Sequence, residues 1–328
     1  MIRRPPRSTR SEFYSPTINL QGLIRFALTG TAGEDPTRPT QFTPMDEERR
    51  VWLQEALTSM SVNVIEELSK ALEVLNPERL ANPEEEEDDF VEALECIIDF
   101  VDSIDTAKDF IKIGGLSIIK PSLDCPHSGV RAAAGELLAT VVQNNPFAQE
   151  ACVSVNILPI LLDRIENDSI ETVRVKTLYA LSCLCRDFPA AQEQLSSCDG
   201  FSCLMRTLQS NCSKLKIKTS FMIASLCQQN PALKDCLCDM GFVEQLIWLV
   251  HSEHDATHEH LLSALFALIS EHPRAIQECR RPELMLETFL QQRIKQLADN
   301  DEDLEEVEHC KAIQNICFPN DTNDEIPR

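Results

Sequence analysis

The sequence predicts an all-α protein: an armadillo-like helical-repeat solenoid, wound into a right-handed superhelix and closed by helical caps. Three observations support this prediction. Only 9 of the 328 residues are glycine and aromatic residues make up 5% of the chain, which disfavours a sheet-rich fold. Pro146, Pro189, Pro231 and Pro273 follow one another at intervals of 42 to 43 residues. The residues around each proline repeat one helical pattern, and a three-helix unit of about 42 residues is typical of armadillo arrays.

Each repeat is predicted to contain three helices. A long apolar stretch such as RVKTLYALSCLCRDFP ends at the proline, and a short amphipathic segment such as AAQEQLS follows it. Another helix, such as DGFSCLMRTLQ, then completes the unit. Proline suits the first turn of a helix because the N–H that it lacks would have no partner there. Gly115, Gly200 and Gly241 are expected to make the sharp turns between the first and second helices.

The chain outside the repeats has a different composition. A short apolar motif, INLQGLIRFALT, precedes a linker rich in proline and threonine, and an acidic run, NPEEEEDD, precedes the first repeat. A charged helical hairpin follows the last repeat, where a cap is needed to cover the exposed end of a solenoid. We therefore expect five parts: a disordered N-terminal segment with the apolar motif at 1–45, a helical region with an acidic linker at 46–89, armadillo-like repeats at 90–281, a C-terminal helical cap at 282–318 and a flexible tail at 319–328.

The charge of the chain excludes two classes of partner. The chain carries 53 acidic and 30 basic side chains, which give a formal net charge of −23. Such a surface repels the phosphates of nucleic acids and anionic lipids, so we expect no nucleic-acid or membrane partner. The 14 cysteines lie mostly among leucine, isoleucine and valine, and no secretory signal opens the sequence. Free thiols in a reducing compartment are therefore expected, which favours a cytoplasmic location and is also compatible with a nuclear one.

One pair of cysteines and one pair of histidines could ligate a metal by residue type, but both pairs are interpreted as structural. Cys183 and Cys185 are two residues apart, and on a helix this spacing points the thiols about 200° away from each other. In the proline alignment they occupy columns of small and apolar residues. His254 and His258 have a spacing that can bind zinc on a helix, but HExxH is absent and the stretch spans a break between helices. We therefore expect no metal and no cofactor.

The sequence also lacks the motifs of an enzyme. It contains no glycine-rich phosphate loop, no GxSxG elbow and no evident pairing of a nucleophile with a base. A helical solenoid offers an extended surface more readily than an enclosed reaction pocket. We therefore expect a binding protein without catalytic residues, and a monomer.

Segments inside and outside the repeats resemble one family. NLQGLIRFALT is followed after a linker by MDEERRVWLQEAL, and an armadillo array requires neither. Together with VRVKTLYALSCLCR, DGFSCLMR and KLKIK, they make residues 18–318 similar to the Hsp70-binding protein family of nucleotide exchange factors. Residues 1–15 depart from the family pattern, and the luminal members of the family would need a signal peptide, which this sequence does not show.

The resemblance implies a function that the periodicity alone does not. It implies a co-chaperone whose concave armadillo face binds lobe II of the ATPase domain of cytosolic heat-shock protein 70. Binding would open or distort the nucleotide cleft and promote ADP release, and would thereby regulate the chaperone. The implied role is that of a nucleotide exchange factor and not of an enzyme.

The proline alignment predicts the residues of the binding face, because the third helices of armadillo arrays line the concave groove. Tyr179 and Phe221 share a column with Glu136 and Ser263, which favours contact with a partner over a place in the core between repeats. The predicted partner-binding residues are Glu136, Lys176, Tyr179, Cys183, Arg186, Lys218, Phe221, Ser225, Gln228, Glu259 and Ser263.

A second function class stays open at this point. The alternative is an armadillo-repeat peptide-binding adaptor or scaffold of importin or catenin type. Those families carry ladders of Trp and Asn on their concave helices, whereas Tyr, Phe, Cys, Ser and Thr occupy the corresponding columns here. Neither Trp52 nor Trp248 falls on a predicted third helix. Nucleotide release from a chaperone, compared with binding to extended peptides, would separate the two functions.

Overall fold

Helices are the only regular elements among the residues that the structure, a computed structural model, describes: 47, 51, 63–298 and 303–319. The chain divides into two units, Met1–Ser69 and Lys70–Arg328, and the second contains the repeats. The predicted segment at 1–45 and nearly all of the predicted tail lie outside the described residues. Two helices precede the repeats, α3 (Val64–Val74) and α4 (Pro77–Leu80).

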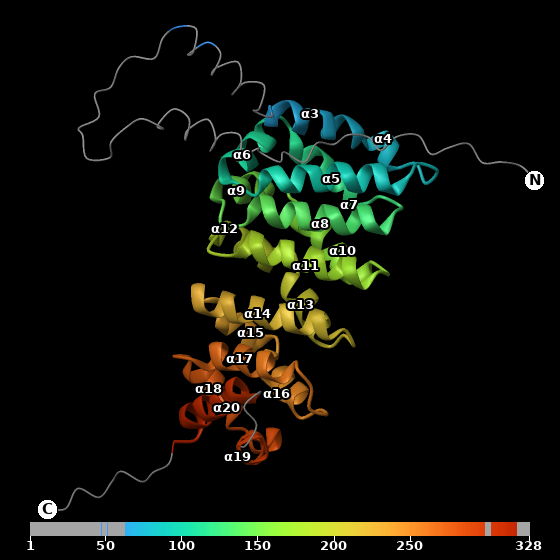
Figure 1. Cartoon of the computed structure of the whole chain (residues 1–328). Coiled ribbons are helices and arrows are strands. Elements are labelled where there is room, and N and C mark those ends of the chain that lie inside the picture. The colour runs from blue at the N-terminus through green and yellow to red at the C-terminus, as the bar shows by residue number, and fades with distance from the viewer. Residues whose placement is uncertain (1–46, 48–50, 52–62, 299–302, 320–328) are drawn as a thin grey trace, which may run out of the picture. The chain divides into compact units, whose positions relative to one another are not determined.

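The second unit is a stack of three-helix layers, which Figure 1 shows as successive bands of colour. The first helices of the layers are short: α6 (Ile104–Lys112), α9 (Pro146–Ser154), α12 (Pro189–Ser197), α15 (Leu233–Asp239) and α18 (Pro273–Cys279). The second helices follow them: α7 (Ile119–Leu123) after the 3₁₀ helix η1 (Gly115–Ile118), α10 (Leu158–Asn167), α13 (Gly200–Leu208), α16 (Phe242–Val250), and α19 (Leu286–Leu297) after the 3₁₀ helix η2 (Pro282–Leu284).

The third helices run side by side through the stack and hold it together. They are α5 (Glu87–Val101), which precedes the first complete layer, and then α8 (Ser128–Val142), α11 (Glu171–Cys185), α14 (Ser213–Gln229), α17 (His258–Ile269) and α20 (Leu304–Cys317). Neighbouring third helices pack against one another, and from α8 onward each also packs against the second helix of its own layer. This arrangement confirms the predicted all-α repeat fold. Among the described residues, no helix is both long enough and apolar enough to cross a membrane.

The core lies between the third helices and the shorter helices behind them. In α11, Leu178, Leu181 and Leu184 are fully buried, and burying one such side chain stabilises the fold by about 1.5–3 kcal/mol. Gly135 lets α8 approach α11 closely, because a Cβ atom there would lie 3.2 Å from the backbone of Lys176 and Thr177. Each layer therefore depends on its neighbours for the burial of its apolar side chains.

The turns between first and second helices repeat with the same period as the prolines. Gly114, Asn156, Asp199, Gly241 and Met285 occupy equivalent places and all have positive φ, between 49° and 90°. The expectation of a glycine turn is confirmed at Gly241. At the other two predicted positions, 115 and 200, it is wrong, because the preceding residue takes the left-handed conformation and the glycine starts the next helix.

Gly200 serves close packing and not backbone conformation. A Cβ atom there would collide with the side chain of Leu195 and would lie 2.7 Å from the Leu195 carbonyl oxygen. Gly115 has the same role, since a Cβ atom there would collide with the ring of Phe110. Glycine is thus needed at these positions for space, while asparagine or aspartate can supply the positive φ one residue earlier.

The first helix of a layer caps the third helix of the same layer. Gln149, on α9, donates its Nε2 to the carbonyl oxygens of Cys183, Leu184 and Arg186 at the end of α11, over 2.9–3.1 Å. Lys234 makes the equivalent contact two layers on, where its Nζ donates to the Ser270 carbonyl oxygen at 2.6 Å. These carbonyl groups have no partner within their own helix, and a cation near them is favourable.

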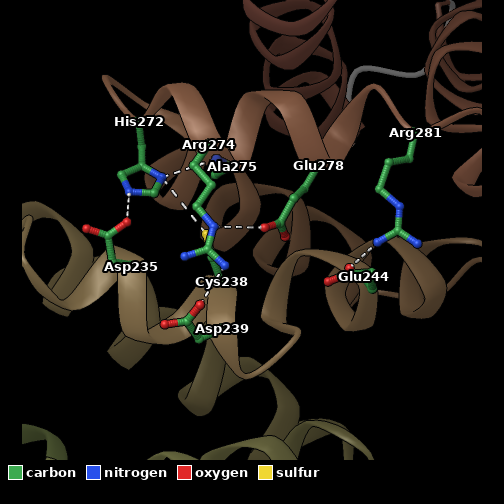
Figure 2. A network of polar contacts seen from close by, with 9 residues as sticks. All are labelled: Asp235, Cys238, Asp239, Glu244, His272, Arg274, Ala275, Glu278 and Arg281. Carbon is green, nitrogen blue, oxygen red and sulfur yellow. Dashed lines mark hydrogen bonds and ion pairs between the residues drawn. The ribbon is translucent and has the colours of Figure 1, made fainter.

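A polar network also joins the first helices of the last two layers (Figure 2). His272 begins α18; its Nε2 lies 3.2 Å from the Asp235 carboxylate of α15. Arg274, two residues further, donates to Asp239 of α15 at 2.6 Å and contacts Glu278 of its own helix at 3.3 Å. Arg274 and the two aspartates are exposed, so their ion pairs contribute little to stability, but the network orients α18 on α15.

One ion pair is buried between layers. Arg131, near the start of α8, donates its Nε to Asp168 Oδ2 at 2.6 Å and a terminal nitrogen to Oδ1 at 3.1 Å. The Asp168 side chain, at the end of α10, is only 1% exposed. Burial alone would raise the pKa of the Asp168 carboxyl, but hydrogen bonds from Arg131 and from the N–H of Ile170 outweigh burial, so the pKa is lowered.

We predict that Asp168→Asn destabilises the protein by about 3 kcal/mol, because it leaves the buried guanidinium of Arg131 without its counter-charge. The measurement is the free energy of unfolding from urea denaturation at neutral pH. Glu150→Gln, which makes the same chemical change at an exposed position of α9, is the control and should unfold like the parent chain. Equal stability of the two variants would contradict a structural role for the pair.

The same pair predicts a dependence of stability on pH. The pKa of Asp168 is lower in the folded than in the unfolded chain, so its stabilisation is present above the ordinary carboxyl pKa. This stabilisation is lost as the pH falls through the lowered pKa that Asp168 has in the folded chain. The difference in unfolding free energy between the parent and Asp168→Asn should therefore be largest near pH 7 and shrink towards about pH 3. A difference that stays constant over this range would show that Asp168 is not ionised in the folded chain.

Candidate partner-binding face

Neighbouring third helices contact one another through one repeated pair of side-chain positions. The first position lies ten residues before the proline of its repeat, and the second lies thirteen residues before the proline of the next repeat. Three such pairs join α8 to α11, α11 to α14 and α14 to α17. We call this row the third-helix ladder: Glu136 with Lys176, Tyr179 with Lys218, and Phe221 with His260.

The first pair of the ladder is an ion pair. Lys176 Nζ lies 2.5 Å from Glu136 Oε2, and both side chains remain partly exposed. An exposed pair of this kind contributes at most about 1 kcal/mol to stability. The pair therefore holds two charged groups in place at the surface without making either of them essential for folding.

The second pair places a cation over an exposed aromatic ring. Lys218 Nζ lies 4.5 Å from the centre of the Tyr179 ring, within range of a cation–π interaction. Tyr179 is 37% exposed, and its hydroxyl donates to Gln143 Oε1 at 3.4 Å. Partial burial raises the pKa of the Tyr179 hydroxyl, so the group stays neutral at physiological pH. The ring thus stands at the surface with Lys218 over one face and its polar end held by Gln143.

The third pair is aromatic. Phe221 and His260 have ring centres 4.7 Å apart and planes tilted by 42°. Phe221 is 55% exposed, which is a large apolar area to leave in water for a side chain of this size. Exposed rings of this kind, surrounded by polar groups, mark surfaces that bind other proteins.

Towards α20 the same face changes its charge. Phe266 of α17 lies three residues after the ladder position Ser263, and its ring centre is 6.0 Å from that of His309 of α20. Burial, with the nearby carboxylate of Glu305, raises the pKa of Glu259, and burial lowers the pKa of His309. The face therefore carries cations at its α11 and α14 part, and carboxylates together with the imidazole of His309 at its α17 and α20 part.

The structure brings together most of the predicted partner-binding residues. Exposed or partly exposed positions are taken by Glu136, Lys176, Tyr179, Arg186, Lys218, Phe221, Ser225, Gln228, Glu259 and Ser263. Arg186 is the C-cap residue of α11, and Ser225 Oγ accepts a hydrogen bond from Gln229 at 2.8 Å. The alignment thus located a surface and not a core.

Cys183 is the exception, since its side chain is only 2% exposed. It follows Tyr179 by one helical turn, and the two side chains are in contact beneath the surface. Burial raises the pKa of the Cys183 thiol, so it is neither charged nor reactive in the folded chain. The expectation that Cys183 contacts a partner directly does not fit this buried position beneath Tyr179.

Sequence reasoning missed His260 as a member of the face. His260 stands thirteen residues before Pro273, in the same column as Lys176 and Lys218. The predicted residue was its neighbour Glu259, whose carboxylate lies 3.6 Å from His260 Nδ1. The proline alignment does place position 260 in this column, and the prediction names the residue before it.

Two family models match the chain. Residues 106–214 match the SIL1/FES1/HPBP1 C-terminal domain, and residues 20–110 match the nucleotide exchange factor Fes1. The chain is 37% identical to Hsp70-binding protein 1 of Homo sapiens over 326 residues, which cover 95% of this chain and 89% of that protein. It is 33% identical to Hsp70 nucleotide exchange factor FES1 of Mycosarcoma maydis over 143 residues, which cover 44% of this chain and 36% of that protein.

Solved structures confirm the type of repeat. The designed armadillo repeat protein YIII(Dq)4CqI matches with a TM-score of 0.60 at 17% identity, over 74% of this chain and 98% of that chain. A second designed armadillo repeat protein, solved in complex with the peptide (KR)4, matches with a TM-score of 0.62 at 16% identity, over 78% and 100% of the two chains. Such low identity shows the fold alone, which is the armadillo-like solenoid that the sequence predicts.

We predict that the thiols of Cys183 and Cys185 resist alkylation in the native chain. Both are buried, and burial raises the pKa of Cys185 to about 12, so little thiolate is present. Mass spectrometry after timed treatment with iodoacetamide should show both labelled at least about 100-fold more slowly than the partly exposed Cys198 and Cys212. In denaturant the four rates should converge. Rapid labelling of Cys183 in the native chain would show that Tyr179 does not cover it.

Proposed function

Because the chain belongs to the family of Hsp70-binding protein 1, we propose that it is a nucleotide exchange factor for heat-shock protein 70. It binds the ATPase domain of the chaperone and promotes the release of ADP, and it acts as a co-chaperone and not as an enzyme. The relatives' names support the partner, and the nucleotide exchange factor family match supports the activity.

The surface proposed for this contact is the third-helix ladder, taken as the concave face of the array. Its support is the combination of two exposed rings, Tyr179 and Phe221, with cations on neighbouring helices. In a chain of net charge −23, cations gathered on one face favour a partner with an acidic surface. We assign lobe II of the ATPase domain as the lobe that the face holds, with one copy of this chain acting as a monomer.

The mechanism follows from linkage. If the chain binds the nucleotide-free form of the chaperone more tightly than the ADP-bound form, it must lower the affinity for ADP by the same factor. A hundredfold effect requires about 2.7 kcal/mol of differential binding, since each tenfold step is about 1.4 kcal/mol. Two well-packed aromatic anchors in a protein interface are enough to supply a difference of that size.

The proposed location is the cytoplasm, where the chain would meet a cytosolic heat-shock protein 70. All 14 cysteines are free thiols and ten of them are buried, which suits a reducing compartment. Peptide binding in the manner of an importin or catenin is the competing function, and the release experiment below distinguishes the two.

We predict that reversing three charges of the face, in the triple variant Lys176→Glu, Arg186→Glu and Lys218→Glu, weakens nucleotide release. The acceleration of release from heat-shock protein 70 should fall by about tenfold or more, because attraction to an acidic partner becomes repulsion. Stopped-flow release of a fluorescent ADP analogue measures the rate. The matched control reverses Lys112, Lys120 and Lys295, which are exposed on other helices, and alters the net charge equally.

Thermal melts decide how a loss of activity is interpreted. Exposed side chains carry about 0.5 kcal/mol or less of folding energy each, so both triple variants should melt close to the parent chain. If the Lys176, Arg186 and Lys218 variant melts normally and releases nucleotide at the parental rate, the contact does not use this face. If the parent chain itself causes no acceleration, the exchange function fails and binding of extended peptides becomes the function to test.

A further inference from the structure

Three side chains of metal-ligating type converge at the C-terminal end of the stack. His254 lies in the loop between α16 and α17, whereas Asp303 and Glu306 lie at the start of α20. One imidazole nitrogen and two carboxylate oxygens of these residues all lie within 4.8 Å of one another. His254 Nε2 is 2.9 Å from Glu306 Oε2, although the two residues are 52 positions apart in the sequence. We call these residues the His254 cluster.

The carboxylate of Glu306 is buried and incompletely satisfied. Its side chain is only 3% exposed, and its Oε1 accepts no hydrogen bond. The guanidinium of Arg293 lies 3.5 Å from this oxygen, a distance that gives an ionic contact but not a hydrogen bond. A buried carboxylate oxygen without a hydrogen bond is costly, so its presence in a folded chain points to a further partner.

A second imidazole stands next to the cluster. His258 begins α17 four residues after His254, and the two ring centres are 5.2 Å apart. The ring of His258 is fully buried; Asp255 contacts its Nδ1, while its Nε2 has no hydrogen-bond partner. The histidine spacing, which the sequence suggests is a simple turn, therefore places a second buried imidazole next to the ring of His254.

Two carboxylates meet at the cluster. The oxygens of Asp303 and Glu306 lie within 4.8 Å of each other and of the His254 imidazole, and the guanidinium of Arg293 lies on the other side of Glu306 Oε1. A dication would offset the repulsion between the two carboxylates, and the partly exposed ring of His254 leaves a route from solvent.

From these observations we propose that His254, Asp303 and Glu306 bind one divalent metal ion of the zinc class. A nitrogen ligand with two carboxylates suits Zn²⁺ or Co²⁺, whereas Mg²⁺ and Ca²⁺ prefer sets made entirely of oxygen. Arg293 would act from outside the coordination sphere and orient Glu306. The ion would fasten the loop before α17 to the start of α20 and so stabilise the last layer of the stack. This site does not depend on the proposed exchange function.

The test titrates the full chain with CoCl₂ after dialysis against a chelator, and repeats the titration with ZnCl₂ by calorimetry. We expect one ion per chain and a rise in the melting temperature. Asp303→Asn and His254→Asn should each weaken binding by about tenfold or more. His251→Asn removes an imidazole from the same loop, where it contacts Leu284 and Phe289 instead, and should bind like the parent.

The cobalt spectrum identifies the ligands, which matters in a chain with 14 thiols. Binding through nitrogen and oxygen gives visible bands without thiolate-to-cobalt charge transfer in the near ultraviolet. The proposal is overturned if the parent takes up no ion, if Asp303→Asn and His254→Asn bind as tightly as His251→Asn, or if the charge-transfer band shows cysteine ligation. Asp303 is the sharper of the two positions, since it is partly exposed and its change leaves the buried Glu306 in place.

Discussion

Side-by-side packing of the third helices is the interaction on which the rest of the structure depends. No layer can bury its own leucines, so α8, α11, α14 and α17 stabilise one another in sequence. The close approach of α8 to α11 at Gly135 sets the separation of these helices, and the buried pair of Arg131 and Asp168 ties the same layers together. The third-helix ladder follows from this packing, because equal spacing of equivalent helices places equivalent side chains in one row. The candidate face is thus a direct product of the repeat.

Much of this fold could be predicted from the spacing of four prolines. Proline marks the first turn of a helix for a local reason, so its period reports the repeat directly. The turns between helices were harder to predict, because a glycine can be needed either for a positive φ or for the space that a Cβ atom would fill. Gly241 itself has the positive φ. At Gly200 the glycine avoids a clash, and the positive φ belongs to Asp199. A sequence shows the glycine but not the Leu195 side chain that it must avoid.

The residues of the candidate face could be predicted from the proline alignment to within about one position. Columns of the alignment show which positions share a face, but not how deep each side chain lies. Tyr179 and Cys183 are one turn apart on the same helix, yet the ring is at the surface and the thiol is beneath it. Contacts across long stretches of chain had no local signal at all. The approach of Glu306 to His254 exists only because α20 packs on α17.

The first helix of a layer caps the third helix of the same layer, so each layer is closed by its own side chains. Gln149 reaches from α9 to the end of α11, Lys234 from α15 to the end of α17, and Arg280, just after α18, to the Cys317 carbonyl oxygen at the end of α20. When the first helix of a layer opens, the third helix of that layer loses its cap, so the two should unfold together as one cooperative unit. A partner that holds only the third helix of a layer would therefore also protect the first helix behind it, without touching it.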